Sequence, residues 1–300
     1  MTTQHFQDIK HPVAGKTISD LTIRQLGSQA AQRPIEDIEL IRHGTNAVFQ
    51  DVSAQVVLRV SEPTPMAGIE DHFALLEHLS DAMASIVEPL DPGIAFNDDI
   101  MVTAWPLGAP TPTDIAGLGT ALRTLHDARV SNTGLTTVNI SDRFTRRLDG
   151  IADDLGVEIA SVLHDKVQAA TEIFDQFMAA AHGVIHGDAH AGNQVQLHGQ
   201  PMLVDLDDIA LGPREFDLLP TVVAATRMDR NGDRLSTFQK AYGQDIDWDA
   251  VDRLRIVRET TMNTWLADKS RKNPAARAQL EHRIATWDAN PLSHEPWGPF

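Results

Sequence analysis

The chain has 300 residues, of which 42% are hydrophobic and 22% charged, so it is long and apolar enough for one large or two modest globular domains. Its 42 acidic residues outnumber its 25 Lys and Arg residues and leave a net charge of −17, so phosphate backbones would be repelled and we expect no nucleic-acid partner. There is no cysteine, which excludes disulfides, thiolate nucleophiles and Cys-ligated metal sites.

The N-terminus has neither the basic nor the apolar segment of a signal peptide, and no apolar run approaches the length that spans a membrane. We therefore expect a cytoplasmic protein with no membrane partner. The acidic surface favours solubility, and it would also suit a cationic substrate.

Short strands with tight turns dominate the first third of the chain. Alternating apolar residues predict an antiparallel meander, and a stripe of apolar residues at helical spacing predicts an amphipathic helix after it. The predicted helices cover residues 19–31 and 69–84, and the predicted strands cover residues 38–41, 47–52, 55–60, 94–97 and 100–105.

A segment rich in Pro and Gly, residues 106–112, separates this part from a mainly helical remainder. We place the lobe boundary here, with one domain over residues 1–105 and another over residues 106–300. The expected class is α+β, with a small β-rich lobe and a larger helical lobe. The helices predicted in the larger lobe cover residues 113–126, 141–155, 157–181, 217–228, 234–242, 248–269 and 274–286.

One loop in the larger lobe concentrates polar side chains that can do chemistry. It follows the short apolar segment 183–185, which reads as a buried strand. Helix interiors and plain turns seldom need such a set of residues. The set comprises His186, Asp188, His190 and Asn193, within eight residues.

A hairpin is predicted directly after this loop, with a four-residue turn over residues 198–201. If Leu197 pairs with Met202, then Asn193 and Asp205 reach the same open end of the hairpin. An amide oxygen and a carboxylate are hard ligands that suit Mg²⁺. Asp188 can stay off the metal and orient an attacking hydroxyl. A metal that holds the phosphates beside a group that orients the hydroxyl is the combination that phosphoryl transfer requires.

Three segments, in this order and spacing, resemble aminoglycoside phosphotransferases and choline kinases. The stretch from His186 to Asn193 resembles their catalytic loop, the stretch 204–207 resembles their metal-binding strand end, and the stretch 212–218 resembles the Gly-Pro…Asp-Leu segment that follows. The resemblance implies a two-lobed protein-kinase-like fold. It also implies transfer of the γ-phosphate of ATP or GTP to a hydroxyl of a small molecule.

The resemblance also implies roles for single residues. Asp188 would be the catalytic base or orient the acceptor, and His190 would lie near the transferred phosphoryl group. Asn193 and Asp205 would bind Mg²⁺. His186 and Asp217 would support the loop, although Asp217 could equally cap a helix. Asp207 would lie behind the metal ligands. Asp207 and Asp208 could also face the substrate or be surface acids.

On the nucleotide side, the turn over residues 43–46 lies where the family has its phosphate-covering loop, so Thr45 and Asn46 are candidates for phosphate contact. An ordinary hairpin turn would have much the same sequence. Arg59 stands where kinases have a phosphate-contacting lysine. The segment 104–107, with Trp105, is expected to contact the purine. The ion-pair partner of Arg59 on the next helix stays open, since Glu70 and Glu77 are available and His72 occupies the expected register.

The helix predicted over residues 248–269 would form a wall of the acceptor site. Glu259 and Trp265 could hold a polar or cationic substrate there, although such residues are more often core tryptophans and solvated charges.

Two alternatives remain at the level of the sequence. One is a metal-dependent hydrolase with His186, Asp188 and His190 as ligands. The other is a catalytically silent kinase-like protein that binds nucleotide.

Overall fold

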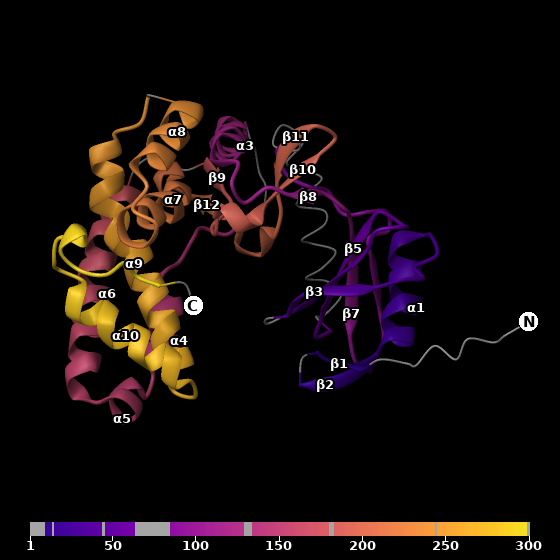
Figure 1. The fold of residues 1–300 in the computed structure, drawn as a ribbon, viewed down its shortest axis with the longest axis horizontal. Coiled ribbons are helices and arrows are strands. Elements are labelled where there is room, and N and C mark those ends of the chain that lie inside the picture. The colour runs from indigo at the N-terminus through magenta and orange to yellow at the C-terminus, as the bar shows by residue number, and fades with distance from the viewer. Residues whose placement is uncertain are drawn as a thin grey trace, which may run out of the picture.

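The structure is a computed structural model, which describes residues 10–13, 15–43, 46–63, 85–128, 134–179, 183–243 and 245–298. It has a small lobe built on an antiparallel sheet and a larger, mainly helical lobe (Figure 1). This is the α+β, two-lobed arrangement that the sequence pattern predicts.

A five-stranded antiparallel sheet forms the small lobe, in the order β3–β4–β5–β7–β6, and a hairpin of β1 and β2 precedes it. Buried residues alternate with partly exposed ones along β4 and β5, so that Val56, Leu58 and Val60 are buried. The strands are β1 Lys10–Val13, β2 Lys16–Ser19, β3 Glu39–His43, β4 Ala47–Asp51, β5 Val56–Ser61, β6 Ile94–Phe96 and β7 Met101–Pro106.

Helix α1 (Asp20–Ala31) lies along the sheet (Figure 1). Ser19 caps it, since its hydroxyl accepts a hydrogen bond from the backbone N–H of Thr22 at 3.2 Å. Gly27 lets the helix approach the sheet closely, because a Cβ there would collide with the side chain of Leu58. The helix predicted over residues 19–31 is therefore confirmed. The helix predicted over residues 69–84 lies outside the described residues.

The large lobe packs α9 against α4, α6, α7 and α10, and α3 against α8. None of the helices in the described part of the chain is long and apolar enough to cross a membrane. Its helices and strands are β8 Ala109–Pro110, α3 Ile115–Asp127, α4 Ser141–Leu148, α5 Ile151–Leu155, α6 Val157–Met178, β9 Gly183–Ile185, β10 Gln194–Leu197, β11 Gln200–Leu203, β12 Ala210–Gly212, α7 Leu219–Val223, α8 Gly232–Tyr242, α9 Trp248–Ser270 and α10 Pro274–Thr286. Short helical turns are η1 Ala191–Asn193, η2 Leu206–Asp208, η3 Arg214–Leu218, η4 Ala224–Met228 and η5 Pro291–Ser293.

Two predicted helices differ from the structure. The single helix predicted over residues 141–155 is wrong, because the chain leaves the helical conformation at Asp149 and Gly150 takes a left-handed φ of 66°, which separates α4 from α5. The segment 217–228 is not one regular helix either. It joins the 3₁₀ turn η3, the short α7 and the π-helix η4, in which the N–H of Asp229 donates to the carbonyl of Ala224 at 3.0 Å.

The hairpin of β10 and β11 has a different register from the predicted one. Leu197 lies opposite Gln200, not Met202, because the turn has two residues rather than four. His198 and Gly199 both have positive φ angles, 52° and 77°, as a type I′ turn requires. The shift is by two residues, so each side chain keeps its face of the hairpin. Asn193 and Asp205 still line one cavity.

Candidate active site

The loop that carries the candidate catalytic residues leaves β9, which pairs with β12. Gly187 makes the turn possible, because its φ is 83° and a Cβ there would collide with the backbone carbonyl of Asp208. The chain then continues through Asp188 into η1, which ends at Asn193. The backbone geometry therefore brings the loop against the segment that carries Asp208.

Asp217 is fully buried and holds the loop through hydrogen bonds to its backbone. Its carboxylate accepts hydrogen bonds from the backbone N–H groups of His186 at 2.6 Å and Gly187 at 2.8 Å. It also contacts Nε2 of His126 at 3.0 Å, and Nδ1 of His126 contacts the hydroxyl of Tyr242 at 2.8 Å. This chain of bonds joins the loop to α3 and α8. Sequence reasoning missed His126 and Tyr242, because no spacing signal connects them with the loop.

His186 is buried and both of its ring nitrogens have partners. Nε2 contacts the carbonyl of Val204 at 2.9 Å, and Nδ1 accepts from the backbone N–H of Asp188 at 3.3 Å. The ring therefore ties the loop to the segment before Asp205, and no nitrogen is left for a metal. This geometry opposes the hydrolase alternative, which needs His186 as a ligand.

Asp188 projects from the loop and is about one-third exposed. Its Oδ1 accepts from Nη1 of Arg258 at 2.7 Å, and its Oδ2 lies 3.8 Å from Nε2 of His190. Burial works against its ionisation, but the charge of Arg258 outweighs that and holds the pKa of Asp188 below its usual value. The carboxylate is thus charged at neutral pH and can accept a proton or orient a hydroxyl.

His190 presents its ring beside Asp188. Its Nδ1 accepts from the N–H of Gly192 at 3.0 Å. Burial, together with the nearby Arg258, lowers the pKa of His190 below its ordinary value, although Asp188 acts in the opposite direction. The neutral ring can therefore donate from Nε2 toward a group bound next to Asp188.

Asn193 and Asp205 line the same cavity at the end of the hairpin. Asn193 is 1% exposed and donates from Nδ2 to the carbonyl of Asp188 at 3.1 Å, while its Oδ1 has no hydrogen-bond partner among the described residues. Asp205 adopts a left-handed backbone conformation with a φ of 66°. A buried amide oxygen without a partner, next to a carboxylate, fits a Mg²⁺ ion that keeps its other positions for waters or phosphates.

The described residues do not form any cluster of three His, Cys, Asp or Glu side chains that could hold a metal ion alone. The candidate metal site therefore consists of two oxygen groups, the amide of Asn193 and the carboxylate of Asp205. Such a small donor set is typical of sites in which the phosphates of a substrate complete the coordination.

A cavity of about 360 Å³ opens between the sheet and the hairpin, a size that suits a small-molecule ligand. Trp105, Asn193, Asp205 and Asp207 line it together with Arg59. Trp105 donates from its indole nitrogen to the hydroxyl of Thr103 at 3.0 Å, which fixes the ring at the edge of the lobe.

Arg59 of β5 points across this cavity to the large lobe. Its guanidinium donates two hydrogen bonds to the carboxylate of Asp207 and lies 3.8 Å from Oδ1 of Asp205. Burial opposes its charge, but the bonds to Asp207 raise the pKa of Arg59 above its ordinary value. The amide of Asn46, with its oxygen toward Arg59, accepts from Nε at 2.9 Å. Thr45 lies outside the described residues.

Two further ion pairs frame the site. Arg42 of β3 donates to Oδ2 of Asp205 at 2.9 Å, and Arg143 of α4 donates to Oδ1 of Asp208 at 2.7 Å. Arg42 and Arg143 were not among the predicted site residues, because an arginine in a strand or helix has no distinguishing pattern in sequence.

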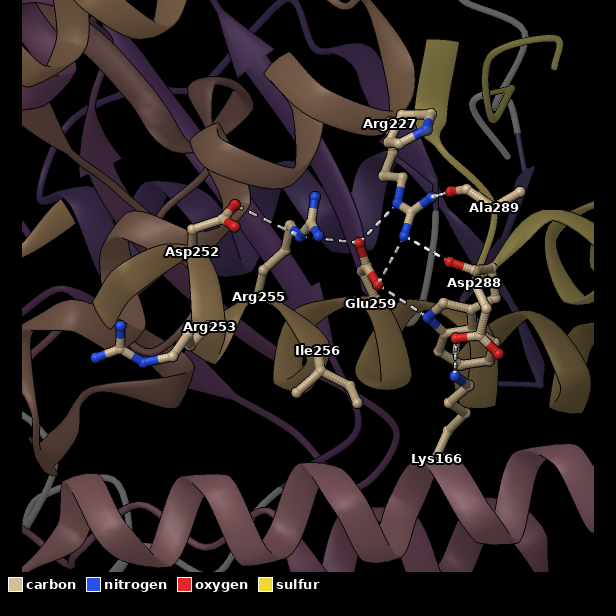
Figure 2. A pocket seen from close by; sticks show the side chains of 11 residues that line it. Lys166, Arg227, Asp252, Arg253, Arg255, Ile256, Glu259, Asp288 and Ala289 are labelled. Atoms are coloured by element: carbon tan, nitrogen blue, oxygen red, sulfur yellow. Dashed lines mark hydrogen bonds and ion pairs between the residues drawn. The ribbon is translucent and has the colours of Figure 1, made fainter. Parts of the chain in front are cut away.

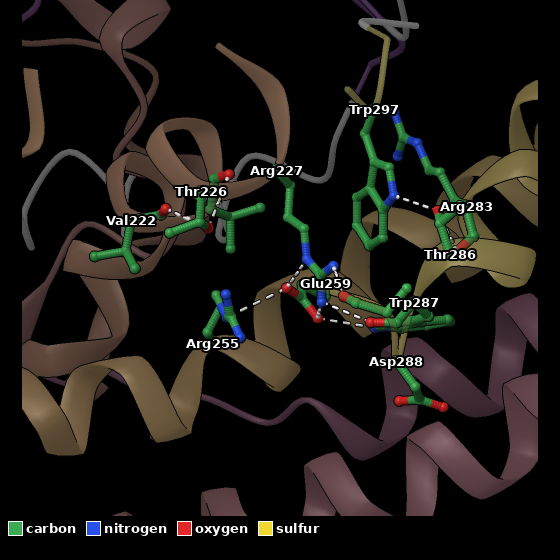
Figure 3. Close-up of polar contacts among 12 residues, drawn as sticks. Val222, Thr226, Arg227, Arg255, Glu259, Arg283, Thr286, Trp287, Asp288 and Trp297 are labelled. Atoms are coloured by element: carbon green, nitrogen blue, oxygen red, sulfur yellow. Dashed lines mark hydrogen bonds and ion pairs between the residues drawn. The ribbon is translucent and has the colours of Figure 1, made fainter. Parts of the chain in front are cut away.

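Glu259 lies away from Asp188, although it follows Arg258 on α9. It is 3% exposed and accepts from Nε of Arg227 at 2.7 Å and from the indole nitrogen of Trp287 at 2.8 Å. Nε of Arg255 lies 3.3 Å from the same carboxylate. Figure 2 shows Glu259 between Arg255 and Arg227 in a separate polar cavity of about 350 Å³. Figure 3 shows the bonds that hold it there.

Trp265 is placed differently from Glu259. It stands seven residues after Arg258, so it lies on the same stripe of α9 about 10 Å further along. Its ring is partly exposed, and Nζ of Lys269 lies 5.6 Å from the ring centroid. Of the two predicted acceptor residues, Trp265 therefore shares the helix face that carries Arg258, and Glu259 does not.

Replacing Asp217 by Ala is expected to lower the free energy of unfolding by about 2 kcal/mol, because the N–H groups of His186 and Gly187 lose a charged acceptor. We also expect kcat to fall, since the loop that carries Asp188 loses its support. Urea unfolding and steady-state kinetics measure both effects. The exposed Asp175 of α6, changed to Ala, is the control. Unchanged stability would show that Asp217 does not hold the loop.

The fold has two kinase-like lobes, and Asp205 lines both the cavity that holds Asn193 and the adjoining opening at which Asp188 stands. The sequence model described as the phosphotransferase enzyme family (APH) matches residues 37–254, well over half of the chain. The chain belongs to this family and is an enzyme that transfers a phosphoryl group to an alcohol acceptor. No curated protein sequence matches it.

Solved structures share this fold at low sequence identity. Spectinomycin phosphotransferase APH(9)-Ia is 16% identical, with 90% of this chain and 95% of that chain covered and a TM-score of 0.67. A choline/ethanolamine kinase family protein from Mesorhizobium loti is 20% identical, with 85% and 87% covered and a TM-score of 0.59. An aminoglycoside phosphotransferase from Alicyclobacillus acidocaldarius is 13% identical, with 94% and 96% covered and a TM-score of 0.58.

Proposed function

We propose that the protein transfers the γ-phosphoryl group of ATP or GTP, with Mg²⁺, to a hydroxyl of a small molecule. The observation that carries this proposal is the buried Oδ1 of Asn193, which lacks a partner in the described part of the chain and lies in one cavity with Asp205. Asp188 stands at the adjoining opening of about 260 Å³, which Asp205 also lines. A metal side and an acceptor side thus meet within one site.

The nucleotide is proposed to bind in the cavity between the lobes, with residues 1–105 as the nucleotide-binding lobe and residues 106–300 as the catalytic lobe. Trp105 would contact the base, and Arg59 would turn from Asp207 to the phosphates, as a guanidinium can pair with either. The structures of two similar proteins support nucleotide binding, because spectinomycin phosphotransferase was solved with ADP and amicoumacin kinase with AMP-PNP.

Mg²⁺, when held by Asn193 and Asp205, would neutralise negative charge on the phosphates during transfer. Asp188 orients the acceptor hydroxyl and receives its proton as the oxygen forms its bond to phosphorus, and the nucleoside diphosphate leaves. His190 can donate from Nε2 to the transferred group. His186 and Asp217 keep the loop in place.

Changing Asn193 to Ala is expected to raise the Mg²⁺ concentration for half-maximal turnover about tenfold or more, because the metal loses one of two protein ligands. Turnover is followed as nucleoside diphosphate formed from ATP, first with Mg²⁺ and then with excess chelator, which should abolish it. Gln196→Ala, on the same strand, is the control variant.

An unchanged Mg²⁺ requirement in Asn193→Ala would contradict the metal assignment. Nucleotide binding without turnover toward any acceptor or water would instead support the catalytically silent alternative. The acceptors named for similar proteins include spectinomycin and streptomycin, and they are the first to try.

A further inference from the structure

Three arginines gather on the acceptor side of Asp188. Arg258 of α9 pairs with Asp188 at 2.7 Å, and Arg143 of α4 pairs with Asp208 at 2.7 Å. Arg147 stands one turn after Arg143 on α4, and its Nη1 donates to the carbonyl of Thr261 at 2.9 Å. Thr261 is one turn after Arg258, so the bond fixes α4 against α9, the helix whose Arg258 reaches Asp188 of the catalytic loop.

Arg147 differs from the other two in its partners. Its one hydrogen bond within the described part of the chain goes to a neutral carbonyl, and no ion pair there includes it. Burial, and then repulsion from Arg143 and Arg258, lowers the pKa of Arg147 to about 10, although Asp268 and Asp208 offset part of this. Arg147 thus lies one turn from Arg143 on α4 and is bonded one turn from Arg258 on α9.

This arrangement is unexpected in a chain with 42 acidic and 25 basic residues other than histidine. A surplus of carboxylates could readily provide Arg147 with a partner, yet the described residues leave a half-buried cation beside two others. Such a placement costs stability, and the cost would be offset if an anionic ligand completes the site.

We propose that the acceptor molecule carries an anionic group, a carboxylate or a phosphate, which binds between Arg147 and Arg258. This inference rests on the proposed function, since it concerns the acceptor of the same transfer reaction. The net charge of −17 would suit a cationic acceptor, but Arg147 has no carboxylate partner among the described residues on the side of Asp188 where α4 meets α9. A guanidinium pair matches the geometry of carboxylate and phosphate oxygens well.

The proposal also gives Arg258 a second role. In the structure its guanidinium donates a hydrogen bond to the carboxylate of Asp188, the group that must orient the acceptor hydroxyl and accept its proton. An acceptor anion would draw Arg258 from the carboxylate, so Asp188 becomes free as the substrate binds. Arg258 is therefore a positioning residue, while Arg147 provides the charge that discriminates between acceptors.

The test compares acceptors that differ in charge and little else. Glycerol, glycerate and 3-amino-1,2-propanediol form one set, and glucose, gluconate and glucosamine form another. Formation of ADP with Mg²⁺ and ATP is measured for each, together with ADP formed without acceptor. We expect the acids to give turnover at least tenfold above their neutral and amino counterparts in kcat/KM.

Arg147→Met tests the residue itself. We expect KM for the preferred acid to rise about tenfold or more while kcat stays within about threefold. The melting temperature should change little, since the variant removes a half-buried charge together with the hydrogen bond to Thr261. Arg146→Met is the matched control, because Arg146 is the next residue of α4 and is exposed. It should leave both quantities unchanged.

Several outcomes would overturn the inference. They are turnover with neutral or amino acceptors but with none of the acids, or equal KM values in the two arginine variants. A fall in melting temperature without a change in KM would show that Arg147 is structural. Failure of the proposed function looks different, because no ADP would then form from ATP with acidic, neutral or amino acceptors, or without an acceptor.

Discussion

Replacing Asp188 by Asn should lower kcat for phosphoryl transfer about a thousandfold, because the amide cannot accept the proton of the acceptor hydroxyl. Nucleotide binding should change little, since Asp188 does not line the large cavity between the lobes. The measurement is single-turnover transfer with the preferred acceptor, next to nucleotide affinity by calorimetry. The two readouts separate a chemical defect from a binding defect.

The control for this variant is Asp165→Asn, an identical change at an exposed position of α6. It should retain full activity. Circular dichroism and melting temperature establish that Asp188→Asn is folded. Transfer at more than about a tenth of the original rate in the folded variant would contradict the assignment of Asp188 as the catalytic group.

Replacing Glu259 by Gln should reduce the free energy of unfolding by about 3 kcal/mol or more, because Arg227 would be left as a buried charge without a counter-ion. Arg227 is 4% exposed, and its remaining acceptors are the backbone carbonyls of Trp287 at 2.6 Å and Ala289 at 3.4 Å. Urea unfolding measures the loss. The kinetic constants of the folded variant should stay close to those of the parent protein.

The matched control is Glu281→Gln on α10, where an exposed carboxylate pairs with Arg277 at 2.6 Å. That change should cost less than about 1 kcal/mol. The double variant Arg227→Met, Glu259→Leu should regain most of the stability lost in the single one, because no unpaired charge remains. A higher KM for the acceptor with unchanged stability would instead show that Glu259 is a substrate residue.

The helix α1 and the meander of the small lobe illustrate what local pattern can predict. Ser19 before an apolar stripe signals a helix start, and alternating residues in β4 and β5 signal strands, because capping and burial depend on nearby residues. The predicted register of the hairpin is wrong, because the two-residue turn needs a left-handed backbone conformation at His198. This conformation is uncommon for a residue other than Gly, so the sequence does not predict it.

The acceptor side was the least predictable part of the site. Helix α9 is polar around much of its circumference, so its sequence does not indicate which face meets the catalytic loop. Packing against α4 and α10 turns Arg258 toward Asp188 and Glu259 toward Arg227. Two consecutive residues thus have unrelated surroundings.

The sequence by itself determined the two-lobed class, the loop from His186 to Asn193 and its link to Asp205, since these depend on residue types at short spacing. The tertiary structure alone decided the contacts between distant segments. They include Asp217 with His126, Arg59 with Asp207, and Arg147 with the carbonyl of Thr261. Such contacts depend on how helices and lobes pack, and packing sums many weak interactions that no short stretch of sequence contains.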